Sequence, residues 1–220
     1  SEEEKLREQL KKWEYFDSQG IVEVSYKGLA IRKMFSAAKN GSEIRFDIID
    51  GGLLGSAAEP LLTLYIGNYV ALKSPFLPML ELLDFSSAIP EESLSLSANT
   101  DSLVTVYGER IIKDKKLKLQ GVTINFNQDY LLDSVSDSLS ATELKALYSS
   151  KGDLSELLIK SKDNISLRLS FDKIEYLQPQ IRPLPKPELS FADDTLKELN
   201  NLNLEALLKE FLQYKKEGQK

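Results

Sequence analysis

Apolar and polar residues alternate with a period of two along most of this chain, a pattern that indicates antiparallel strands with one dry face. Before the alternation begins, the apolar positions of residues 2–14 recur with the spacing of a helix. Turn residues interrupt the alternation at Asn40, Gly41 and Gly67, and Asn-Gly is a strong signal for a two-residue hairpin. We therefore predict a helix and then a meander of about five strands that ends near Lys73.

The pattern is weaker after the meander. Prolines end it, and a compact apolar segment, residues 76–83, is typical of a short helix. Strands are predicted to resume at residues 103–107, 110–113 and 116–126, where apolar residues alternate again. Residues 129–150 fit two structures, a helix that starts at a Ser-Ala-Thr-Glu capping sequence or a strand through two adjacent leucines.

A second hairpin is predicted over residues 154–177, and residues 165–171 within it alternate strictly between apolar and polar positions. We assign residues 1–178 to one α+β domain with a curved antiparallel sheet. A proline-rich extended linker follows at 179–192, and an amphipathic helix at 193–220. That helix either docks on the domain's own sheet or binds a partner protein through residues 194–216.

The composition removes several kinds of chemistry. The 220 residues include no His and no Cys, which excludes zinc sites built on imidazole or thiolate, thiol nucleophiles and His-based triads. The net charge is −6 at pH 7 and the basic residues are dispersed, so nucleic acid is not an expected partner. No spacing of Asp, Glu, Lys, Tyr or Ser indicates an active site, so we predict no enzymatic activity, no cofactor and no metal.

A glycine-rich segment, residues 51–55, holds two adjacent leucines between two alternating segments. It lacks the Gly-Lys-Ser/Thr ending of a phosphate-binding loop. Leu53 and Leu54 are therefore interpreted in two ways: they are tucked under the domain, or they contact something apolar such as a membrane. Each leucine moved from water into such an environment contributes about 1.5–3 kcal/mol, which makes the contact of two weak and reversible.

The predicted helices are few for the sheet that they must cover. A curved sheet with a few helices across its mouth leaves a cavity that suits an acyl chain or another apolar ligand. The alternative is that the helices close an ordinary core. The predicted lining of the cavity is Val22, Val24, Phe35, Phe46, Leu64, Leu167 and Phe171.

The order of segments over residues 6–74 resembles the LolB-like branch of the outer-membrane lipoprotein localisation factors, whose relatives include the LolA-like carriers. The resemblance lies in a leading helix that ends at Trp13, in the segments GIVEV, IRKMFSA and EIRFDI, and in the Gly-Leu-Leu-Gly loop that follows them. The hairpin at 154–177 is similar in character to the closing strands of the family. The C-terminal helix departs from the family pattern.

The resemblance implies an unclosed antiparallel β-barrel, or half-barrel, with a helical lid over an apolar cavity. Members of the family bind the acyl chains of lipoproteins and deliver them to the outer membrane, and the loop that holds Leu53 and Leu54 here contacts the bilayer. The resemblance also implies a periplasmic protein tethered to the outer membrane by an N-terminal lipid, on a Cys that this chain does not contain.

Two functions from different classes are therefore expected. The first is a non-enzymatic periplasmic carrier or acceptor of lipoproteins or lipids, with acyl chains and the membrane surface as its partners. The alternative is a scaffold or interaction module of an envelope complex, with a solid core and a C-terminal helix that binds a partner protein.

Overall fold

The computed structural model describes residues 1–50, 59–88 and 98–190. The predicted membrane-contact residues, Leu53 and Leu54, lie outside the described residues, as does the predicted C-terminal helix.

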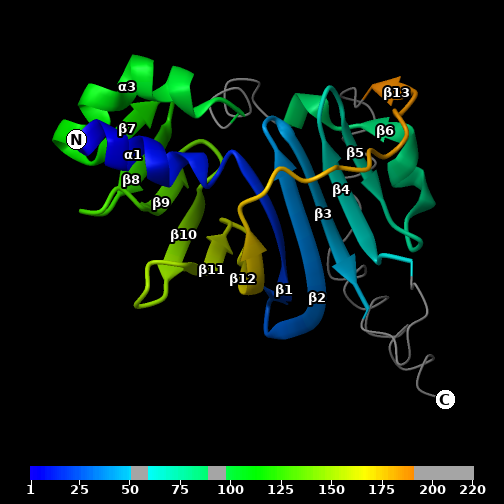
Figure 1. Cartoon of the computed structure of the whole chain (residues 1–220). Coiled ribbons are helices and arrows are strands. Elements are labelled where there is room, and N and C mark those ends of the chain that lie inside the picture. Colours follow the sequence, from blue (N-terminus) through cyan, green and yellow to red (C-terminus); the bar gives the residue numbers. More distant parts are fainter. Residues whose placement is uncertain (51–58, 89–97, 191–220) are drawn as a thin grey trace.

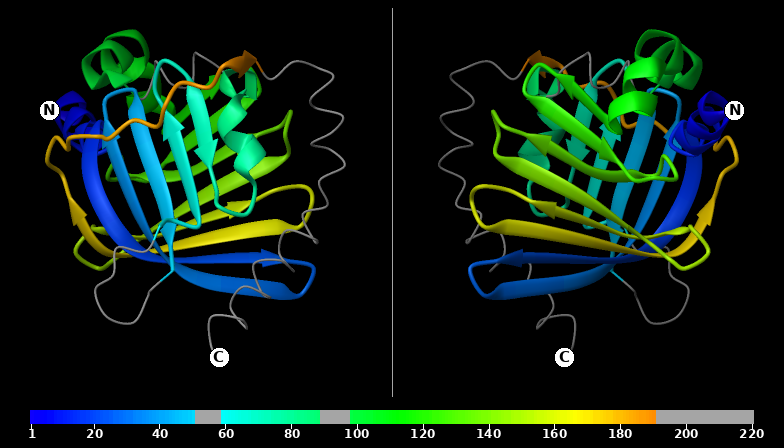
Figure 2. Two further views of the ribbon diagram at one scale, coloured as in Figure 1. Left: turned by 90° about the vertical axis from the view of Figure 1, so that its right-hand side faces the viewer. Right: turned by 90° about the vertical axis from the view of Figure 1, so that its left-hand side faces the viewer.

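Eleven antiparallel strands form one curved sheet that does not close into a barrel (Figures 1 and 2). Their order is β5-β4-β3-β2-β1-β12-β11-β10-β9-β8-β7, so two meanders meet where β1 pairs with β12. This arrangement, with helices on one face, confirms the predicted α+β half-barrel. The strands of this sheet are β1 (Tyr15–Tyr26), β2 (Leu29–Asn40), β3 (Glu43–Ile49), β4 (Leu62–Ile66), β5 (Val70–Lys73), β7 (Lys116–Leu119), β8 (Val122–Phe126), β9 (Leu132–Asp137), β10 (Thr142–Tyr148), β11 (Leu154–Lys160) and β12 (Ile165–Glu175).

The turns of the first meander follow from their residue types. Lys27 and Gly28, at φ 45° and 80°, form the two-residue turn between β1 and β2, with the positive φ angles of type I′. Gly41, at φ 61°, and Ser42 connect β2 to β3 with the geometry of type II′. The Asn-Gly signal thus predicted the right hairpin, although Asn40 is the last residue of the strand rather than part of the turn.

Helix α1 (Glu2–Lys11) begins with a capping box, in which Ser1 and Glu4 satisfy each other's backbone N–H groups. The predicted short helix near residue 80 is a 3₁₀-helix, η1 (Pro78–Leu82), and η2 (Ser86–Ala88) follows it. No helix in the described part of the chain has the length and the apolar character needed to span a bilayer.

Helix α3 (Thr100–Asp114) replaces the strands predicted at 103–107 and 110–113, and that prediction was wrong. The β-branched residues of this segment favour strands locally, which produced the error. The buried side chains of Val104 and Ile111 instead lie on one helical stripe. An asparagine caps the N-terminus of the helix, and a lysine in the left-handed conformation ends it.

The segment after α3 folds into strands throughout. The strand predicted at 116–126 is a hairpin of two strands, β7 and β8, around two residues with positive φ. Residues 129–150 form β9 and β10 rather than a helix, and Val135 stands opposite Leu144 across this hairpin. The Ser-Ala-Thr-Glu sequence lies at the turn, where the Ser140 hydroxyl donates to a carboxylate of β9.

The two α-helices cover one end of the sheet. Leu6 of α1 and Ile111 of α3, both 0% exposed, pack with Leu117 of β7 and Phe126 of β8 in one core cluster. Burial of this apolar area holds the helices on the β7–β8 end, while the cluster in the middle of the sheet is built, within residues 1–50, 59–88 and 98–190, from strand residues.

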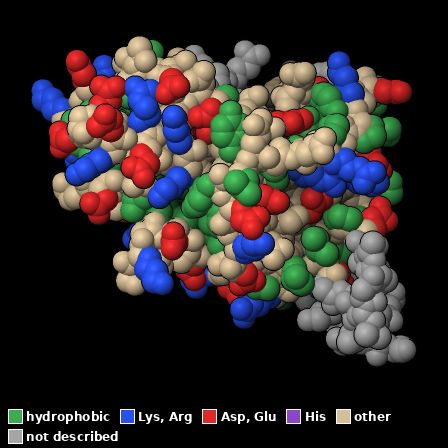
Figure 3. All heavy atoms as spheres, in the orientation of Figure 1, with side chains coloured by type: hydrophobic (Ala, Val, Ile, Leu, Met, Phe, Trp, Pro, Cys, Tyr) green, Lys and Arg blue, Asp and Glu red, His purple; other side chains and the backbone are tan. Residues whose placement is uncertain are grey.

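The proline-rich segment at 177–188, which we call the strap, runs as extended chain across the face of β2–β5 opposite to the apolar one (Figure 1, yellow to orange). Leu184 of the strap packs with Tyr65 of β4, and Arg45 Nη1 donates to the Arg182 carbonyl at 2.7 Å. In Figure 3, apolar and charged side chains are intermixed on this side. The strap leads into β13 (Leu189–Ser190), which pairs in parallel with β6 (Leu83–Asp84). The domain boundaries at 178 and 192 stay a prediction.

Candidate functional site

Alternate residues of neighbouring strands build one apolar face of the sheet. Val22 of β1 stands opposite Leu169 of β12, and Phe35 of β2 stands opposite Ile48 of β3. The structure brings six of the seven predicted lining residues into one cluster and places the seventh on the same face, opposite one of the six. The six are Val22, Val24, Phe35, Phe46, Leu167 and Phe171, and the seventh is Leu64, which stands opposite Phe46. Their role in binding a ligand stays a prediction.

Aromatic rings close the middle of this face. The Phe35 ring stacks on the Phe46 ring with 5.7 Å between centroids, and it meets the Phe171 ring edge to face at 5.4 Å. Among the residues that the structure describes, the cluster contains strand residues only, with no contribution from α1 or α3. Toward the turn between β1 and β2, Val24 and Leu167 are half-buried. The face is therefore a packed core in its middle and partly accessible at that end.

A small apolar pocket adjoins the cluster between the end of α1 and strands β1, β10, β11 and β12. Its volume is about 40 Å³, and its lining includes Trp13, Phe16, Tyr148, Leu157 and Phe171. Sites for small molecules usually measure about 300–1,000 Å³, so this pocket is too small for an acyl chain as the side chains stand. The cavity predicted from the sequence thus appears, in the described part of the chain, as a packed face with one small pocket.

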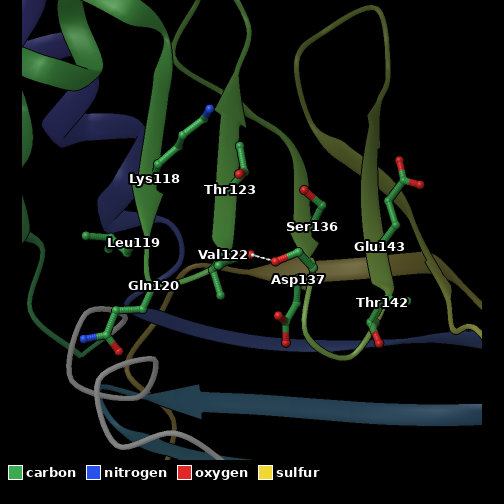
Figure 4. A pocket seen from close by; sticks show the side chains of 12 residues that line it. Lys118, Leu119, Gln120, Val122, Thr123, Ser136, Asp137, Thr142 and Glu143 are labelled. Atoms are coloured by element: carbon green, nitrogen blue, oxygen red, sulfur yellow. Dashed lines mark hydrogen bonds between the residues drawn. The ribbon is translucent and has the colours of Figure 1, made fainter.

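The larger hollows are polar and open. One of about 510 Å³ lies at the turns that join β7 to β8 and β9 to β10 (Figure 4). Lys118 of β7, Asp137 of β9, Glu143 of β10 and Gln120 of the β7–β8 turn line it, and their polar ends point in different directions. Within the described ranges, no three acidic side chains are grouped so that they could hold a metal ion. The hollow therefore has the character of a solvated surface.

Two lysines of β2 lie on the apolar face, where no charged residue was predicted from the sequence. Lys33 Nζ is 2.8 Å from Asp50 Oδ1, and the Lys33 side chain is 11% exposed. Lys39 is 5% exposed and donates to the Gly41 carbonyl. Burial lowers the pKa of Lys39 to about 8, against the opposing effect of the Glu14 carboxylate. The sequence pattern could have located both lysines, because alternate residues of a strand share a face and Lys33 and Lys39 lie an even number of residues from the buried Phe35.

Comparison with known proteins bears on the fold alone. No known family matches the chain, and no curated protein matches it. A LolA superfamily protein from Nitrosomonas europaea has a TM-score of 0.43 and 6% identity, covering 83% of this chain and 94% of its own. A putative outer membrane lipoprotein-sorting protein domain from Vibrio parahaemolyticus has a TM-score of 0.41 and 12% identity, and the match covers 79% of this chain and 91% of that one. A DUF1329 family protein from Desulfovibrio piger has a TM-score of 0.35 and 8% identity, and the match covers 78% of this chain and 90% of that one.

These scores are low, so the description of the fold rests on the strand order of this chain. The narrower resemblance to LolB-like proteins stays a prediction.

Proposed function

We propose that this protein is a non-enzymatic carrier or acceptor that binds the acyl chain of a lipid or lipoprotein against the apolar face of its sheet. The observation that supports the proposal is the strand-only cluster around Phe35. Val24 and Leu167 belong to this cluster, yet they are only half-buried. Each Å² of apolar surface removed from water contributes about 25 cal/mol, so an acyl chain laid on these residues is stabilised by the burial that the protein leaves incomplete.

Binding in this proposal requires side chains to move apart. The apolar pocket measures about 40 Å³, whereas sites for small molecules usually measure about 300–1,000 Å³. The rings of Phe46 and Phe171 meet Phe35 through side-chain contacts, so they can rotate without breaking the strand ladder. We therefore expect a bound chain to change the aromatic packing and to leave the strand pairing intact.

The proposal also covers where the protein acts and the membrane to which it delivers its cargo. The protein would act in the periplasm and deliver its cargo to the outer membrane, and Leu53 and Leu54 would contact the bilayer. Two adjacent leucines among glycines support this part of the proposal. Replacing both leucines by Glu should weaken binding to liposomes and slow transfer of a fluorescent acyl cargo to them. Unchanged liposome binding and unchanged transfer would contradict the proposed role of the loop.

A charge placed on the apolar face tests acyl binding directly. Leu167→Glu puts a carboxylate among the half-buried residues, and we expect it to reduce the affinity for a fluorescent fatty-acid analogue at least tenfold, because burying the charge is costly. Met34→Glu is the matched control, since Met34 is 48% exposed on the opposite face of β2. Equal affinities for the two variants, with both shown to be folded by circular dichroism, would reject the proposal.

Removal of residues 191–220 separates the carrier function from the scaffold alternative. If the apolar face binds the acyl chain, the truncated protein keeps most of its affinity for the fatty-acid analogue. If the full chain does not bind the analogue, and truncation abolishes capture of a protein partner while the fold is retained, the scaffold function is favoured instead.

A further inference from the structure

The apolar face includes the positively charged side chain of Lys33, which makes no contribution to apolar packing through its ammonium group. Lys33 lies between Ile31 and Phe35 in the alternation of β2, and it stands opposite Val22 of β1, which is 1% exposed. Its own side chain is 11% exposed. An ammonium group among apolar side chains costs free energy unless a partner compensates for the lost water. The position therefore calls for a negatively charged partner.

Asp50 supplies such a partner from the solvent side. Its Oδ1 atom is 2.8 Å from Lys33 Nζ, and its side chain is 38% exposed, more than three times as much as that of Lys33. An ammonium has three donors, and Asp50 is its one partner among the described residues. An anion that approaches from solvent thus meets an ammonium that has already lost much of its water, beside a carboxylate that it can replace.

We propose that Lys33 binds the anionic head group of a lipid whose acyl chain lies on the apolar face. The inference rests on the proposed acyl-binding function and narrows its substrate to lipids that carry a negatively charged head group. Ile31, the neighbour of Lys33 on the same face, stands opposite Val24, and Val24 stands opposite Leu167. A chain that starts at Lys33 therefore meets a row of half-buried apolar side chains across three strands.

The second lysine of this face does not suit the same role. Lys39 is 5% exposed, and its ammonium donates to the Gly41 carbonyl within the fold. A head group would have to displace a backbone acceptor in order to reach it. The charge complementarity therefore lies at Lys33, where the competing group is a side chain at the surface.

Oleate and oleyl alcohol have the same chain and differ only in the head group, so together they isolate the contribution of Lys33. We expect calorimetric titration to show that the wild-type protein binds oleate about tenfold more tightly than oleyl alcohol. Lys33→Gln should abolish this preference, whereas Lys33→Arg should keep it. Arg32→Gln, an exposed change on the other face of the same strand, should also keep it. An undiminished preference in Lys33→Gln would overturn the inference.

Asp50→Asn gives a test in the opposite direction. Removing the internal competitor should raise the affinity for oleate by about fivefold to tenfold and leave that for oleyl alcohol unchanged. No gain for oleate, or a loss, would overturn the inference even if Lys33→Gln failed to fold.

The two proposals fail in different ways. If the wild-type protein binds neither compound, acyl binding itself is rejected; if it binds both equally, acyl binding stands and only the head-group site is rejected.

Discussion

The rings of Phe35 and Phe171 meet edge to face across β1, at an interplanar angle of 88° and a centroid distance of 5.4 Å. The strand between them contributes Gly20, which pairs with Phe35 on one side and with Phe171 on the other. A Cβ atom at Gly20 would lie 1.9 Å from the Ser170 carbonyl oxygen. The close approach of β1 and β12 at this irregularity of register therefore requires a glycine.

Gly20→Ala should destabilise the protein by about 3 kcal/mol, because the added methyl group meets backbone atoms that cannot move without separating the strands. Urea denaturation monitored by circular dichroism measures the change. Ser25→Ala, at the far end of the same strand, should change the free energy of unfolding by less than about 0.5 kcal/mol. A similar effect for the two variants would show that β1 and β12 adjust at Gly20.

Phe35→Ala should lower the free energy of unfolding by about 3–5 kcal/mol, because it removes a ring that is 1% exposed and packs against two others. Met34→Ala changes the adjacent residue, which is 48% exposed on the other face, and should cost about 0.5 kcal/mol or less. Chemical denaturation of the two variants compares them directly. Comparable losses would mean that the two faces of β2 are not divided into buried and exposed as the structure shows.

The strap is held mainly by side chains of the sheet that donate hydrogen bonds to its backbone carbonyls, so substituting those side chains should loosen the strap. Arg45 bridges the Arg182 carbonyl and the buried Asp47 carboxylate, and Arg45→Met should cost about 1.5–3 kcal/mol. Tyr69→Phe removes only a hydrogen bond to the Leu184 carbonyl and should cost about 1 kcal/mol. In hydrogen exchange, both variants should show faster exchange in the strap.

Arg168→Met, at an exposed arginine on β12, provides the control for the strap. It should leave exchange in the strap unchanged. Unaltered exchange in Arg45→Met would contradict the anchoring role of these hydrogen bonds.

Lys39 gives the stability a distinct dependence on pH. Burial lowers its pKa from 10.5 to about 8, so the folded protein holds this proton less tightly than the unfolded chain does. Below pH 8 the cost of the buried charge is fully present. Between pH 8 and 10.5 the unfolded chain binds more protons, so the contribution of Lys39 to the free energy of unfolding rises with pH. Other groups that titrate between pH 8 and 10.5 change the stability of the wild-type protein and of a Lys39 variant alike, so their effect cancels in the difference between the two.

The difference in stability between the wild-type protein and Lys39→Met should therefore move in favour of the wild type from pH 8 to pH 10.5. Urea denaturation at several pH values measures it. Lys11→Met, at an exposed lysine of α1, should give a curve parallel to that of the wild type. A parallel curve for Lys39→Met as well would show that the Lys39 ammonium is not desolvated in the folded state.

Local rules account for the parts of the fold that the sequence predicted. Hairpins depend on neighbouring residues: an alternating pattern and a glycine that accepts a positive φ, as at Gly28 and Gly41, are enough to define them. The shared face of Val22, Phe35 and Phe46 follows from the same alternation once the strands pair in register.

The rest depends on contacts that are distant in the sequence. Val104 and Ile111 belong to a segment with strand propensity, and their packing against Leu6 of α1 favours a helix there. The strap has a sequence typical of a linker, because its anchors are side chains of β2, β3 and the β4–β5 turn, more than a hundred residues earlier. The cavity stays a prediction, because alternation shows which side chains avoid water and does not show how closely they pack.

The pairing of β1 with β12 determines when the sheet can be completed. Each meander is a ladder of local hairpins that forms soon after its residues are available, whereas the junction at the centre joins β1 to β12, the first and the last strands of this sheet in sequence order. During synthesis from the N-terminus, β1 is made before the other strands of this sheet, and its edge toward β12 waits longest for a partner. Until residue 175 has emerged, that edge presents unpaired N–H and C=O groups next to Val22 and Phe35, and the nascent chain is most prone there to pair with another copy of itself.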